Sequence, residues 1–173
     1  MEAYWDYITD SNLRQGDYLP DCYIPDFGSD FSPDITENVP IDMADLIILT
    51  QSCDLEDGGV NYAALAPIYS IEKFKEVNSR LCTNNNLNLM RSGRIEGLYL
   101  LASQRAPSNC WQSLIVDFRE IYTLPVGYLA NHARDIGERW RLRSPYLEHF
   151  SQAFARFYMR VGLPSRIPKF TSE

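Results

Sequence analysis

The chain contains few of the residues that most often carry catalysis or covalent cross-links. It has two histidines, His132 and His149, and four cysteines at scattered positions without a Cys-x-x-Cys pair. This spacing indicates neither a disulfide framework nor a zinc ribbon. We therefore expect reduced thiols and no bound metal or other cofactor.

Long hydrophobic runs are also missing. The apolar stretches fall far short of the roughly 20 residues that a membrane-spanning helix needs. The first segment, MEAYWDYITD, has neither a basic flank nor an apolar run. We therefore expect a cytoplasmic protein that does not associate with membranes. Its 173 residues, 45% of them hydrophobic and 13% aromatic, suit a single domain, 1–173, with a true core.

Basic residues are almost absent from the first third of the chain. Residues 1–60 contain 14 acidic residues and one base, Arg14, whereas residues 61–173 contain 9 acids and 15 bases. The basic part can offer a surface to phosphate or to an acidic partner, or it can pair with the acidic part of the same chain. The net charge of -7 opposes binding to nucleic acid and favours pairing within the chain.

Turn residues and apolar runs predict strands in the first part of the chain. LRQGDYL (13–19) turns at Gln15-Gly16 and continues as a strand, and LIIL (46–49) is typical of a buried strand. Glycines at 58 and 59 allow a tight turn into a return strand at 60–68. The acidic, proline-rich segment 20–44 predicts a long loop. Segment 2–8 is a helical turn or a strand.

The second part of the chain alternates helices and strands. Ser70 is the predicted N-cap of a helix at 70–78, and three asparagines, 84–86, predict a turn before another helical piece. Two strands follow, at 96–103 and 112–125. The closing helix, 144–161, has apolar residues every three or four positions, with Ser144 as N-cap and Pro145 in the first turn.

These elements predict an α+β fold. We expect a small, strongly curved antiparallel barrel of roughly five or six strands. A helical insertion lies near 70–90, and the amphipathic C-terminal helix covers one opening of the barrel.

Three segments in this order, LRQGDYL, DLIILTQSCDL and VNYAALAPI, resemble the opening strands of the PemK/MazF-like toxins. TQSCDL also resembles the strand end of a group of uncharacterised bacterial proteins associated with phage and defence, and SPYLEHFSQAFARFYMRVGLP resembles their closing helix. The resemblance implies an SH3-like barrel and a role in a toxin–antitoxin or phage-defence system. Typical ribonucleases of the family have Arg-Pro before the second strand, whereas Asp45 stands here.

Polar residues follow the most apolar strand without a spacer: Thr50, Gln51, Ser52, Cys53 and Asp54. They form either a binding site at a strand end or a polar rim whose groups are satisfied within the fold. A reactive thiol needs a nearby cation, and the adjacent carboxylate has the opposite effect on its pKa. We therefore expect a rim in which Cys53 packs as a small apolar residue, and its substitution by serine to be nearly silent.

Arginines and a few hydroxyl or imidazole groups are the remaining site candidates. Arg156 and Arg160 lie four apart on the closing helix and present two guanidinium groups on one face, to a phosphate or carboxylate ligand or to acids of residues 1–60. Ser70, His132 and Arg143 are the candidates for RNA cleavage, which needs a base, an acid and a cation.

Two functions follow from these patterns. The first is a non-catalytic or weakly catalytic defence-associated protein that acts through a partner, either a protein from the same operon or RNA. The alternative is a diverged PemK/MazF-like endoribonuclease that cleaves single-stranded RNA. The acidic balance and the missing entering arginine favour the first, and the oligomeric state, a dimer included, stays open.

Overall fold

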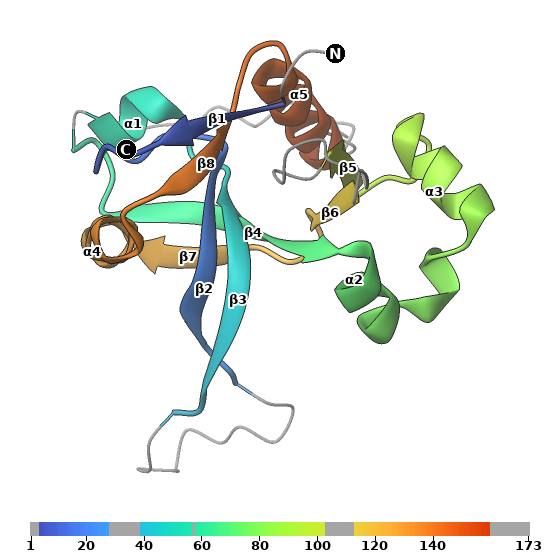
Figure 1. Ribbon diagram of the computed structural model, residues 1–173, viewed down its shortest axis with the longest axis horizontal. Helices are drawn as coiled ribbons and strands as arrows, with labels where there is room; N and C mark the ends of the chain where they lie inside the picture. Colours follow the sequence, from blue (N-terminus) through green and yellow to red (C-terminus); the bar gives the residue numbers. More distant parts are fainter. Residues whose placement is uncertain (1–3, 28–38, 57, 103–112, 160–173) are drawn as a thin grey trace, which may run out of the picture.

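A computed structural model describes residues 4–27, 39–56, 58–102 and 113–159 (Figure 1). Within these ranges, eight strands form one antiparallel sheet in the order β1-β8-β2-β3-β4-β6-β5, with β7 paired to β4. The strands are β1 (Trp5–Ile8), β2 (Asp17–Pro25), β3 (Ile41–Ile48), β4 (Tyr62–Ser70), β5 (Leu98–Ala102), β6 (Ser113–Asp117), β7 (Tyr122–Pro125) and β8 (Arg139–Leu142).

Five α-helices and one short 3-10 helix connect or cover these strands. They are α1 (Ser52–Glu56), α2 (Ile71–Val77), the 3-10 helix η1 (Ser79–Leu81), α3 (Asn84–Arg91), α4 (Val126–Ile136) and α5 (Tyr146–Tyr158). No helix in the described ranges combines the length and apolarity that a membrane crossing requires. The α+β class is therefore as expected.

The expected closed barrel is wrong. The end strands of the sheet, β1 and β5, do not pair, so the sheet stays open. It is nevertheless strongly curved, as a contact between its two end strands shows. The indole Nε1 of Trp5 in β1 donates a hydrogen bond of 2.8 Å to the carbonyl oxygen of Ala102 in β5. A side chain bridges the gap where backbone pairing would have closed a barrel.

Local signals predicted the centre of the sheet well. β3 and β4 pair through Leu46↔Pro67 and Ile48↔Leu65, as the apolar runs indicated. The Ser70 hydroxyl caps α2 by accepting the Lys73 N–H at 3.1 Å. Between β3 and β4 the chain forms the short helix α1, which the sequence did not predict; Asp57, in the expected turn, lies outside the described residues.

The segment expected as a loop at 20–44 is partly strand. β2 continues to Pro25 and β3 begins at Ile41, and the two pair from Cys22↔Ala44 to Pro25↔Ile41. The pairing register shifts between Leu19 and Cys22, which marks a β-bulge. We call the described strands beyond this bulge, 22–25 and 41–44, the hairpin arm; its far end extends beyond the other elements in Figure 1, while its Cys22 and Ile24 side chains are buried in the core near α4.

Several other boundaries differ from the sequence expectation. The asparagines at 84–86 form the first turn of α3, capped by the Thr83 hydroxyl, rather than a turn before it. The strand expected at 112–125 is divided into β6 and β7, which pair with successive parts of β4. Pro145, not Ser144, occupies the cap position of α5, while residues after 159 lie outside the described ranges. The sequence did not predict α4 or β8.

Gly16 allows three elements to approach each other closely. Its N–H donates to the Ile48 carbonyl at 2.9 Å, and its carbonyl accepts from the Leu142 N–H at 3.0 Å. Its φ is +81°, and a Cβ there would lie 2.8 Å from Cδ1 of Leu147 in α5. Only glycine meets both the backbone angle and the space.

Gly16→Ala should therefore lower the free energy of unfolding by about 1–3 kcal/mol. The matched control is Gly127→Ala in α4, where a Cβ meets nothing within 4 Å and helix propensity favours alanine. Urea unfolding followed by circular dichroism measures both. Equal stability of the two variants would contradict the close packing at Gly16.

Candidate functional site

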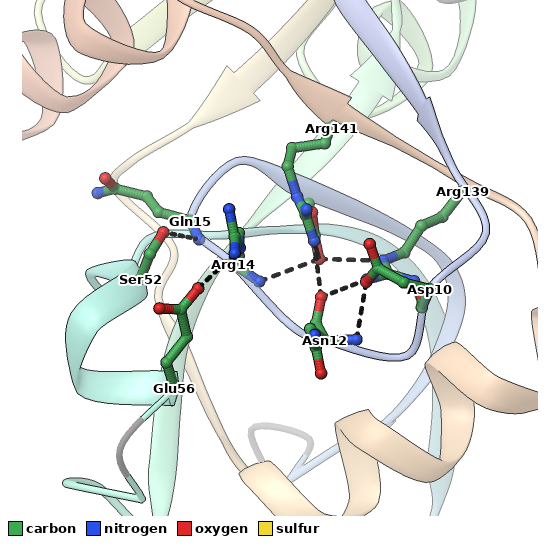
Figure 2. Close-up of polar contacts among 9 residues, drawn as sticks. Asp10, Asn12, Arg14, Gln15, Ser52, Glu56, Arg139 and Arg141 are labelled. Carbon is green, nitrogen blue, oxygen red and sulfur yellow. Dashed lines mark hydrogen bonds and ion pairs between the residues drawn. The ribbon is translucent and has the colours of Figure 1, made fainter.

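The polar residues after β3 divide into internal partners and exposed groups. The Thr50 hydroxyl accepts the Ala64 N–H at 2.8 Å and supports the β3–β4 connection. The Ser52 hydroxyl accepts the Gln15 N–H at 3.1 Å (Figure 2). Gln51, Cys53 and Asp54 are exposed. The hydroxyls of Thr50 and Ser52 are thus satisfied within the fold.

Gln15 is a buried polar residue that sequence reasoning did not single out. Its Nε2 donates to the Leu49 carbonyl at 2.8 Å, and its Oε1 accepts from the Ser151 hydroxyl at 3.1 Å. It thereby connects the turn before β2 with the end of β3 and with α5. No motif marks such a residue, because its partners are far from it along the chain.

The three cysteines in the described part of the chain, Cys22, Cys53 and Cys82, are free thiols. Cys22 is buried in the core beside Leu19, and burial, with smaller contributions from Asp45 and Asp21, raises the pKa of its thiol to about 12. The expectation that Cys53 packs as a small apolar residue is wrong: Cys53 is exposed, and its Sγ lies 3.8 Å from Oδ1 of Asp54. No group of three or more His, Cys, Asp or Glu residues in the described part of the chain has a metal-binding arrangement.

The main concentration of buried charge surrounds Asp17, the first residue of β2. The side chains of Asp17 and of Arg139 in β8 are both 0% exposed, and Nε of Arg139 lies 3.0 Å from Oδ2 of Asp17. Arg141 binds the same carboxylate through Nε and through Nη2, the latter at 3.0 Å. The Arg14 N–H also donates to Asp17, at 3.1 Å. One buried carboxylate therefore serves two guanidinium groups.

The spare guanidinium donors of these arginines hold the loop between β1 and β2 (Figure 2). Arg139 donates to the backbone carbonyls of Asp10 and Asn12, and Arg141 donates to the Asn12 carbonyl at 2.6 Å. Arg139 also forms an ion pair with the Asp10 carboxylate at 3.4 Å. These contacts satisfy the buried charges and fix the loop.

Arg143 follows β8 and continues this pattern at the surface. Its Nε lies 3.9 Å from Oδ1 of Asp6, and its N–H donates to the Tyr4 carbonyl at 3.1 Å. Arg139 and Arg141 likewise pair with acids of the first 60 residues. The pairing of the acidic first part with the basic remainder is thus confirmed for these three arginines.

His132 supports the bulge of β2 from α4. Its Nε2 lies 2.7 Å from the Pro20 carbonyl, which can only accept, so Nε2 carries the hydrogen. One turn earlier, the Tyr128 hydroxyl accepts the Tyr23 N–H at 2.7 Å. Asp21, which follows Pro20 in the bulge, has a φ of +52°. Two side chains of α4 therefore bind backbone groups of β2, one within the bulge and one just beyond it.

The three candidates for RNA cleavage do not come together. Ser70 ends β4 and caps α2, whereas α4, which carries His132, begins beside the other end of β4, where Tyr62 pairs with Pro125. Eight residue steps along a strand separate these ends by about 26 Å. Arg143 lies beyond β8 and pairs with Asp6.

The two binding candidates on the closing helix have different outcomes. Arg156 lies in the last turn of α5 and lines a cleft of about 480 Å³ between α5 and the connection from α3 to β5. Arg160 lies outside the described residues. The cleft brings together residues from distant parts of the chain, so no local motif predicts it.

No protein-family model, curated protein or solved structure matches this chain. The function is therefore argued from the geometry of the sites alone.

Asp17→Asn should lower the free energy of unfolding by about 3–5 kcal/mol, because it leaves two buried or partly buried guanidinium groups without their counter-charge. Asp54→Asn is the control, since that carboxylate is exposed and has no ion pair in the described residues. Urea unfolding measures both. A loss below about 1 kcal/mol at Asp17 would contradict its role.

His132→Ala should destabilise the protein by about 1–2 kcal/mol, because the Pro20 carbonyl loses its donor. His132→Gln, which retains an N–H donor, should recover part of this loss. Thermal unfolding of both variants tests the role in the bulge. If His132→Ala leaves the thermal stability unchanged, the histidine is not needed at the bulge and is free for another role.

Proposed function

We propose that the protein is a binding module, associated with a toxin or phage-defence system, that acts through a protein partner with a basic surface. The hairpin arm carries this proposal. It projects from the sheet as a two-stranded ribbon (Figure 1), whose strands pair with each other and with no other strand beyond the bulge. One face of the arm is covered, because Cys22 and Ile24 are buried in the core cluster that includes Leu129 of α4. The opposite face is the one that another chain can reach.

Large apolar side chains line one face of this arm. Tyr23 and Met43, both 57% exposed, are paired across the strands, and Ile41, 68% exposed, pairs with Pro25. Residues two apart in a strand share a face, so these four side chains form one stripe. An exposed apolar stripe with a polar surround is typical of a surface that binds another protein.

The charge of the arm indicates which kind of partner suits it. Residues 20–45 contain seven acids and no base, and Asp21, Asp26 and Asp42 are exposed in the described part. This field repels nucleic acid and steers a basic surface toward the apolar stripe. A protein with basic residues around an apolar patch is therefore favoured over RNA at this site.

We also propose that Ser70, His132 and Arg143, the candidates for RNA cleavage, do not form a catalytic centre. Each of Ser70, His132 and Arg143 has a contact within the fold, and they lie on different elements. The proposed kinship with PemK/MazF-like proteins rests on the resemblance of the sequence segments LRQGDYL, DLIILTQSCDL and VNYAALAPI.

Co-expression with the products of the two flanking genes tests the proposed function. We expect one of them to co-elute with the protein on size exclusion, and the complex to weaken as ionic strength rises. The double variant Tyr23→Ser/Met43→Ser should weaken binding by about tenfold or more. The control, Tyr62→Ser, removes a tyrosine that is 59% exposed but lies outside the arm.

Three outcomes would contradict the proposal. They are binding that the arm variant leaves unchanged, a self-dimer formed through the arm, and metal-independent cleavage of labelled single-stranded RNA that His132→Ala or Arg143→Ala abolishes. The last outcome would support the endoribonuclease instead.

A further inference from the structure

The cleft beside α5 has the size of a site for a small ligand. Its volume of about 480 Å³ lies within the usual range of ligand pockets, roughly 300–1,000 Å³. One wall consists of residues 90–100, from the end of α3 into β5, and the other of one face of α5. Tyr4 and Phe118 complete it.

Two arginines in this cleft lack the side-chain partners that Arg119 and Arg139 have. Arg91 ends α3 and Arg156 lies in the last turn of α5, and neither side chain has an ion pair or hydrogen bond with another described residue. By contrast, Arg119 is held by Asp117 through Nε at 2.8 Å, and Arg139 by Asp17. Helix C-termini favour cations but leave the guanidinium donors available. Glu96 also lines the cleft, so the two guanidinium groups together with this carboxylate leave a net charge of one positive unit to attract an anion.

Aromatic rings lie in the same cleft. Tyr4 and Tyr146 stack with ring centroids 3.7 Å apart and an angle of 11° between their planes. Tyr99 and Phe157 also line the cleft. Flat aromatic faces bind flat heteroaromatic rings by stacking, and the bases of nucleotides are such rings.

The order of groups along α5 runs from aromatic to hydrogen-bonding to cationic. Tyr146, His149, Gln152 and Arg156 are three or four residues apart, so they lie on one helix face, and all four line the cleft. The row covers roughly 15 Å along the helix axis. A ring, a polar linker and an anionic end fit this order.

We propose that the cleft binds a free nucleoside phosphate, with the base against the Tyr4–Tyr146 pair and the phosphate between Arg91 and Arg156. His149 and Gln152 contact the sugar and the base edge. A small nucleotide is favoured over an RNA strand because the chain carries a net charge of -7, which repels a polyanion far more than it repels one short phosphate group.

Calorimetric titration of the full chain tests this assignment. The probes are the four ribonucleoside diphosphates, with adenosine, inorganic phosphate and a ten-nucleotide single-stranded RNA as comparisons. At least one diphosphate should bind with a Kd below about 1 mM, and its nucleoside and phosphate alone should each bind at least about tenfold more weakly. Arg91→Gln and Arg156→Gln should each weaken binding by about tenfold.

Arg134→Gln is the matched control, since it removes the same charge from exposed α4 outside the cleft, and its affinity should equal that of the parent chain. Absence of binding by all four diphosphates, tighter binding of the RNA, or equal losses in the three arginine variants would overturn the proposal. The arm variant Tyr23→Ser/Met43→Ser should bind nucleotide normally, so this result and the partner test are independent.

Discussion

The buried carboxylate of Asp17 is the contact on which the arrangement of the sheet depends. Removing a carboxylate and two guanidinium groups from water is costly, and only their mutual pairing with full hydrogen bonding offsets this cost. Arg139 and Arg141 come from β8, near the end of the described chain, and Asp17 opens β2. The pairing therefore holds β8 between β1 and β2. Gly16, the residue before Asp17, allows β8 and α5 to approach this contact closely.

Other polar residues that the sequence singles out also have partners within the fold. Thr50, Ser52 and His132 satisfy backbone groups, and Arg143 pairs with Asp6. Side chains with such internal partners stabilise the fold. Within the described residues, the apolar stripe of the hairpin arm and Arg91 and Arg156 of the cleft are not committed in this way, and they are the surfaces that we propose for binding.

Short-range signals were sufficient for part of the fold. The β3–β4 pair, the Ser70 cap and most of α5 were predictable, because apolar runs, capping residues and helical spacing act within a few residues. The hairpin arm was expected as a loop because of its prolines. Pro20 lies within the bulge and Pro25 in the last pair of the ribbon, where a missing N–H is tolerated. Sequence alone did not distinguish these positions from a loop.

Long-range features were less accessible. The opposite charges of the two parts of the chain indicated pairing but not which residues pair, because β8 and the bulge were not predicted. The cleft was missed since its walls come from residues 90–100 and from α5, with Tyr4 and Phe118 added from elsewhere. Only Arg156 among its residues was a predicted binding candidate, and its neighbours had no shared pattern in sequence.

A double-mutant cycle between Asp17 and Arg139 tests the central claim most directly. Unfolding free energies of Asp17→Asn, Arg139→Gln and the double variant give the coupling between the two side chains. The account predicts that the double variant loses about 2–3 kcal/mol less than the sum of the single losses, because each single change strands a buried group. Additivity within about 0.5 kcal/mol would contradict it.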